Sequence, residues 1–157
     1  MEEETADRPD VSIHPPTVFF AALLIGFTMR AFTGGMLPMP RVFGEGVGGL
    51  LMLAGLAAAI SAVSAFAESG ETLRPSTPSN ELLTDGMYRY SRNPIYLAMV
   101  LFGVGFGFAT LNLWIILTTA AAGAVFHYFV IPPEESYLER KFGSEFRDYK
   151  AQVRRWL

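Results

Sequence analysis

The chain has 157 residues, a length suited to one domain, of which 51% are hydrophobic and only 17% are charged. Soluble domains carry about 25% charged residues, so this composition excludes an ordinary soluble domain and favours an all-α polytopic membrane protein. The lack of cysteine excludes disulfides and thiolate metal sites, and with a net charge of -3 we expect neither a metal nor nucleic acid as a ligand.

The N-terminal third predicts a tail and two scaffold spans. Residues 1–16 begin with an acidic stretch, which we interpret as a mobile tail. The apolar run at residues 17–29 is short for a span of about 20 residues. The run at residues 46–67 is long enough, and its many glycines and alanines permit close helix packing. We therefore expect residues 17–67 to supply two spans joined by a glycine- and proline-rich loop.

The longest apolar stretch, residues 94–131, predicts a helical hairpin. It is too long for one span, and Thr110 and Asn112 interrupt it with polar side chains near its middle. The proline pair that follows Ile131 is expected to end the membrane part. The chain therefore has about four spans by this interpretation.

Two polar segments, residues 68–93 and 134–157, flank this hairpin. Prolines and Gly86 prevent the first from forming one helix. Apolar residues recur at spacings of three and four in the second, where Gly143 leaves open one helix or two. With four spans both segments lie on one side together with both termini, and they carry most of the Lys and Arg residues. The positive-inside rule places that side in the cytoplasm, where the two segments should meet and form one site.

The residues just before the hairpin combine aromatic rings with fixed positive charge. Tyr88, Arg89, Tyr90 and Arg92 are followed by Asn93-Pro94, which predicts an extended residue and then a helix start. Such a pattern fits an anchor at the membrane interface or a binding site.

The second polar segment begins with paired carboxylates, Glu134 and Glu135. Their position next to a span suits hydrogen bonding to hydroxyl groups or to a cationic ligand, and it also suits capping of a helix N-terminus. His127 lies one to two turns earlier on the last span. It belongs either to the same site or to a hydrogen-bonded interfacial cluster.

The two polar segments resemble two motifs of the isoprenylcysteine carboxyl methyltransferases and related phospholipid methyltransferases. The first match is Gly86-x-Tyr88-x-x-x-Arg92-Asn93-Pro94-x-Tyr96-Leu97, and the second is Glu134-Glu135-x-x-Leu138-x-x-x-Phe142-Gly143-x-x-Phe146-x-x-Tyr149. Asn93 replaces the family's usual histidine and cannot act as an acid or base near neutral pH. Phe146 replaces a tyrosine and removes one hydroxyl group.

This resemblance implies an enzyme that binds S-adenosylmethionine without a Rossmann domain, in residues 68–157 of a single methyltransferase-like domain. The resemblance implies a cofactor pocket lined by Tyr88, Arg92, Asn93, Pro94, Tyr96, Leu97, Glu134 and Glu135. We add His127 to this pocket. Arg140 and Glu135 are the catalytic candidates, Arg140 as the residue that orients an anionic acceptor.

The acceptor is expected to be hydrophobic or lipid-like, to enter from the membrane lipids and to accept the methyl group on a carboxylate, amine or thiol. Two other functions remain open. One is an NADPH-dependent membrane reductase of the steroid-reductase type, whose motif also contains Arg-x-Pro-x-Tyr. The other is a non-catalytic four-span transporter or assembly protein. The paired acids favour methyl transfer, and the scarcity of polar residues within the spans argues against a transporter.

Overall fold

The computed structural model describes residues 13–69 and 81–157. The acidic stretch to residue 12 and residues 70–80 of the first polar segment lie outside the described residues. The described part is helical, which confirms the all-α prediction. Its elements are α1 (Pro15–Thr33), α2 (Arg41–Ser69), the 3₁₀ turn η1 (Gly86–Arg89), α3 (Pro94–Ala109), α4 (Leu113–Val125), the π-helical turn η2 (Phe126–Val130), α5 (Ile131–Phe142) and α6 (Ser144–Gln152).

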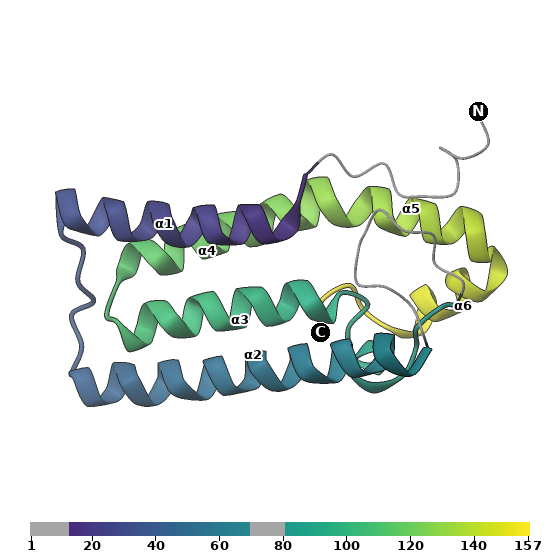
Figure 1. Cartoon of the computed structure of the whole chain (residues 1–157), viewed down its shortest axis with the longest axis horizontal. Coiled ribbons are helices and arrows are strands. Elements are labelled where there is room, and N and C mark those ends of the chain that lie inside the picture. Colours follow the sequence, from purple (N-terminus) through teal and green to yellow (C-terminus); the bar gives the residue numbers. More distant parts are fainter. Residues whose placement is uncertain (1–12, 70–80) are drawn as a thin grey trace.

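The long helices run side by side in a bundle (Figure 1). Helix α2 packs along α3, α1 packs along α4, and α3 and α4 form the predicted hairpin. The outer faces of α1 and α2 expose large apolar side chains such as Phe20, Leu24, Leu50 and Leu53. A lipid bilayer covers such a surface favourably, whereas water does not.

Three of the described helices are long and apolar enough to cross a membrane: α1, α2 and the continuous helix from Leu113 to Phe142. Helix α3 is a shorter apolar helix of 16 residues. The chain is therefore an integral membrane protein with several helical segments in the bilayer, as the composition predicts.

Helices α1 and α2 are both longer than the apolar runs that predict them. Helix α2 begins at Arg41, five residues before the predicted start, because Arg41 forms an i,i+4 ion pair of 2.7 Å with Glu45. Two prolines fit the first turn of α1, so this helix starts at Pro15 and reaches 19 residues. The apolar runs were shorter than the helices because a charged residue ends a hydrophobic run, whereas the helical backbone continues through it.

The turn of the hairpin forms where the sequence predicts it. The Asn112 side chain caps α4 by accepting hydrogen bonds from the backbone N–H groups of Trp114, at 3.0 Å, and Ile115, at 3.3 Å. At the same end of the bundle, the Arg30 guanidinium donates a hydrogen bond of 2.6 Å to the Thr110 carbonyl. The end of α1 is thereby attached to the hairpin turn.

The proline pair does not end the last helix, which corrects the predicted boundary at residue 131. The chain instead forms the π-helical turn η2 just before it, and the Ile131 N–H bonds to the Phe126 carbonyl. A proline lacks an N–H group and clashes with the carbonyl four residues earlier. The wider π turn accommodates both prolines, so the helix continues and carries Glu134 and Glu135 beyond the bundle.

The periodic apolar residues of the last segment form a small second core. Helices α5 and α6 break at Gly143, whose φ of 58° favours glycine. Leu82 of the first polar segment is buried together with Phe146 and Tyr149 of α6. The core therefore fixes the two polar segments against each other, as the hairpin topology predicts.

Glycines let α2 and α3 touch backbone to backbone. A Cβ atom added to Gly48 would lie 2.5 Å from both the Gly105 carbonyl oxygen and the Ala109 nitrogen. Close approach of this kind supplies the van der Waals contact that associates helices in a bilayer. This confirms the close packing expected from the composition of α2.

Substitution of Gly48 by Ala should destabilise the bundle by about 1–3 kcal/mol, because the methyl group meets rigid backbone atoms. Gly49 is the matched control, since a Cβ atom there meets nothing within 4 Å. Gly49→Ala should be neutral or stabilise the helix by up to about 1 kcal/mol. Thermal unfolding in detergent, followed by circular dichroism, measures both. Equal melting temperatures for the two variants would contradict this packing.

Candidate functional site

The residues that lead into α3 and the residues that follow α6 are joined by hydrogen bonds. The Arg92 N–H donates to the Arg154 carbonyl at 3.0 Å. The Ser91 hydroxyl and the Asn93 side-chain amide both donate to the Arg155 carbonyl, at 3.3 and 3.1 Å. The two polar segments therefore meet where the sequence analysis expects a site.

A buried carboxylate lies between two guanidinium groups at this meeting point. Arg92 Nη2 lies 2.7 Å from Glu135 Oε1, and Arg155 Nη2 lies 2.6 Å from Glu135 Oε2. The side chains of Arg92 and Glu135 are only 9% and 8% exposed. Arg92 also donates to the carbonyls of Lys150 and Val153. The cluster of Arg92, Glu135 and Arg155 therefore links α3, α5 and the segment after α6, with a net positive charge.

The neighbouring acid has a different partner. The Tyr96 hydroxyl donates a hydrogen bond of 2.6 Å to Glu134 Oε1. The Tyr96 ring packs on Phe126 of the π turn, with 5.2 Å between ring centroids. Both paired carboxylates thus make tertiary contacts with residues of the first motif, beyond any contribution to capping α5.

Tyr88 belongs to the same region through its backbone. The Tyr149 hydroxyl donates a hydrogen bond of 2.7 Å to the Tyr88 carbonyl. Burial raises the pKa of both tyrosine hydroxyls above the ordinary value of 10.0. Tyr149 therefore stays protonated and keeps donating this bond at any physiological pH.

The structure places His127 beside the segment that follows α6. Its Nδ1 accepts a hydrogen bond of 3.0 Å from Trp156 Nε1, and the two rings stack at 20°. His127 is therefore hydrogen-bonded, and its partner Trp156 lies next to the Arg155 that contacts Glu135.

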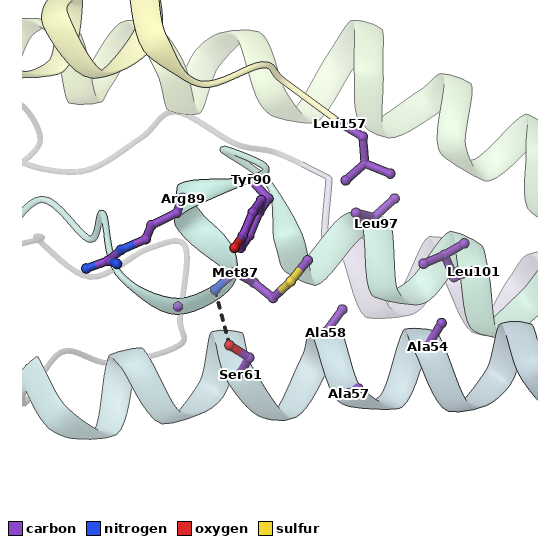
Figure 2. A pocket seen from close by; sticks show the side chains of 11 residues that line it. Ala54, Ala57, Ala58, Ser61, Met87, Arg89, Tyr90, Leu97, Leu101 and Leu157 are labelled. Atoms are coloured by element: carbon purple, nitrogen blue, oxygen red, sulfur yellow. Dashed lines mark hydrogen bonds between the residues drawn. The ribbon is translucent and has the colours of Figure 1, made fainter.

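A mainly apolar groove of about 600 Å³ opens between α2 and α3 next to this region (Figure 2). The Met87 N–H donates a hydrogen bond of 3.1 Å to the Ser61 hydroxyl, which attaches η1 to α2 at one end of the groove. The lining residues are Ala54, Ala57, Ala58, Ser61, Gly86, Met87, Arg89, Tyr90, Leu97, Leu101 and Leu157. Leu97 therefore faces this groove, whereas its neighbour Tyr96 contacts Glu134.

Arg140 lies apart from these contacts. It is exposed on α5, and five residues of helix turn it about 140° away from Glu135. Pro94, by contrast, is buried at the first turn of α3, where it sets the direction of the helix.

Sequence reasoning missed Arg155, Ser91 and Trp156 as site residues. The sequence gives no signal for Arg155, because it does not show that Glu135 is buried and contacts two arginines. Ser91 is fully buried, but nothing in the sequence marks its hydroxyl as a partner of the distant Arg155 carbonyl.

Long apolar helices and a buried polar cluster at one end of the bundle define a membrane protein with a candidate polar site. The sequence profile described as phospholipid methyltransferase matches residues 45–145. The chain belongs to this family. A segment of 33 residues is also 61% identical to an uncharacterized protein of Haemophilus influenzae. This segment is 21% of the chain and about half, 52%, of that relative's length.

Replacing Glu135 by Gln should cost about 3 kcal/mol of stability, because the buried Arg92 guanidinium and the partly buried Arg155 guanidinium lose their counter-charge. Glu139→Gln is the matched control one turn along α5. It removes a more exposed ion pair, with Lys150 at 3.4 Å, which is worth less than about 1 kcal/mol. Chemical or thermal unfolding in detergent compares the two. A Glu135→Gln variant as stable as Glu139→Gln would mean that the cluster is not holding the segments together.

Proposed function

We propose that this protein is an S-adenosylmethionine-dependent methyltransferase that methylates a hydrophobic or lipid-like acceptor at the membrane surface. The observation that carries the proposal is that two polar pairs, Arg92 with Glu135 and Tyr96 with Glu134, lie beside an apolar groove. The cluster and the groove share the start of α3, since Tyr96 belongs to one and Leu97 to the other. Family membership supplies the reaction class.

The chemistry of the polar cluster fits this cofactor. Glu134 and Glu135 suit its cationic amino group or its ribose hydroxyls, and Arg92 with Asn93 suits its carboxylate. Aromatic rings at Tyr88 and Tyr96 offer surfaces for an adenine ring. When bound, the cofactor supplies a methyl group on a positively charged sulfur, which is already electrophilic.

The protein's own contribution is to bind, orient and exclude water. Glu135 is fixed by two guanidinium groups, so we assign it a binding and positioning role rather than proton transfer. Asn93 uses its side-chain amide to hold the Arg155 carbonyl. This role needs no titration near neutral pH, so asparagine can stand where relatives have histidine.

The groove between α2 and α3 is the proposed acceptor site. Its walls are alanine and leucine side chains, and its polar end carries Arg89 and Tyr90. A lipid-like acceptor would place its chain along the walls and its head group near Arg89. Arg89 lines the groove and Arg140 does not, so Arg89 is the better candidate to orient an anionic group, although it also pairs with Asp85 at 2.7 Å. The excess of Lys and Arg near this end supports a cytoplasmic location for the site and both termini.

Binding of S-adenosylmethionine or S-adenosylhomocysteine should stabilise the detergent-purified protein. A ligand at 100 times its Kd adds roughly 2.7 kcal/mol to the unfolding free energy, which raises the melting temperature by several degrees. NADPH is the control ligand, because a membrane reductase would respond to it instead. Stabilisation by NADPH alone, or no response to either adenosyl compound over a wide concentration range, would refute the proposal.

Filling the groove should weaken binding of the acceptor without affecting binding of the cofactor. Ala54→Phe places a ring in the groove, whereas Leu53→Phe changes the neighbouring residue, which does not line it. We expect Ala54→Phe to raise the acceptor KM at least about tenfold, a loss of about 1.4 kcal/mol in binding, with the Kd of S-adenosylhomocysteine unchanged.

The acceptor for this measurement comes from methyl transfer with labelled cofactor and native membrane extract. The labelled product is purified and used for kinetics with both variants. If Ala54→Phe and Leu53→Phe have the same KM, the acceptor binds elsewhere.

A further inference from the structure

We propose that residues 153–157 form a displaceable latch that closes the cofactor site and the acceptor groove together. Arg155 occupies a position on Glu135 that a cationic group of the cofactor can take, and Leu157 is one of the residues that line the groove. This inference rests on the proposed function and goes beyond it, because it predicts that cofactor binding opens the acceptor groove.

The latch is held mainly by hydrogen bonds, because none of its side chains is buried and only Val153 and Trp156 pack partly against the two cores. It is extended at Val153, just after α6 ends, and its carbonyls accept hydrogen bonds from Arg92, Ser91 and Asn93. Water can replace such bonds at small net cost, about 0.5–1.5 kcal/mol each. The latch is therefore easier to move than the helices that pack through buried apolar side chains.

The two arginines on Glu135 differ in how firmly they are held. Arg92 is 9% exposed and also donates to the Lys150 carbonyl of α6, which lies outside the latch. Arg155 is 28% exposed, and among the described residues its guanidinium bonds to Glu135 alone. One carboxylate cannot favourably accept a third cation, so a cationic ligand must displace one arginine. Arg155 is the one that leaves at the smaller cost.

Displacement of Arg155 moves a side chain that lines the groove. Leu157 is 64% exposed and lies above Leu97 and Leu101 at the groove (Figure 2). It is two residues from Arg155, a reach of at most about 7 Å of extended chain, so the two residues move together. Trp156 lies between them and leaves its contact with His127 in the same movement. The acceptor groove therefore opens after the cofactor site is filled.

Fluorescence of Trp156 reports this movement directly. The chain has two tryptophans, and Trp114→Phe leaves Trp156 as the only one. The buried Trp114 indole nitrogen has no hydrogen-bond partner among the described residues, so this substitution should be tolerated. We expect saturating S-adenosylhomocysteine to shift the Trp156 emission, with a midpoint equal to the Kd from calorimetry. Binding heat without any change in Trp156 emission would overturn the latch and leave the proposed function standing. No binding heat at all would overturn both.

Arg155→Ala gives an independent test by affinity. Removing the competing guanidinium should tighten binding of S-adenosylhomocysteine about fivefold, because the closed latch reduces apparent affinity by the fraction of open sites. Arg154→Ala is the matched control, since its side chain is exposed and only its carbonyl holds the latch. Calorimetry measures the Kd of S-adenosylhomocysteine for both variants. Unchanged or weaker binding by Arg155→Ala would make Arg155 a structural residue or a cofactor ligand and overturn the proposal.

Discussion

The buried ion pair between Arg92 and Glu135 is the interaction on which the polar end of the molecule depends. Taking these two charges out of water costs several kcal/mol each, and only close geometry and further hydrogen bonds offset that cost. Arg155 and the carbonyls that accept from Arg92 supply those bonds. Three separate parts of the chain meet here when the latch is closed: the residues before α3, helix α5 and the segment after α6. The cluster closes only when the whole domain is folded, and it defines where a ligand's charged groups can be received.

The apolar part of the fold brings these parts together. Backbone contact at Gly48 and Gly105 fixes α2 against α3, and the hairpin turn at Asn112 returns the chain to the polar end. The π turn then lets the last helix pass its prolines and deliver Glu134 and Glu135 beyond the bundle. The polar cluster consequently lies at one end of the bundle, beside the apolar groove between α2 and α3. That arrangement suits an enzyme whose cofactor is soluble and whose acceptor is in the membrane.

Much of this could be predicted from particular residues. Asn93-Pro94 marked the start of α3, Thr110 and Asn112 marked the turn, and Gly143 marked the break between α5 and α6. The two motifs identified Arg92, Tyr96, Glu134 and Glu135, and the structure brings them together as two pairs, Arg92 with Glu135 and Tyr96 with Glu134. The helix ends were less predictable, because Arg41 and the proline pair end a hydrophobic run without ending a helix. Arg140 matched a family expectation of charge near the acids, but helical rotation carries it to an exposed position.

The sequence by itself determined the membrane class, the hairpin and the residue types of the site, since hydropathy, proline and glycine act through local physics. The tertiary structure alone decided which residue each side chain meets. Glu134 bonds to Tyr96 while Glu135 bonds to two arginines, and His127 bonds to Trp156, because these partners lie 20 to 43 residues apart in the chain. The pairing of Arg155 with Glu135, and the position of Leu157 on the groove, depend on how residues 153–157 pass over the start of α3. No local pattern specifies that path, because long-range packing and buried charge select it.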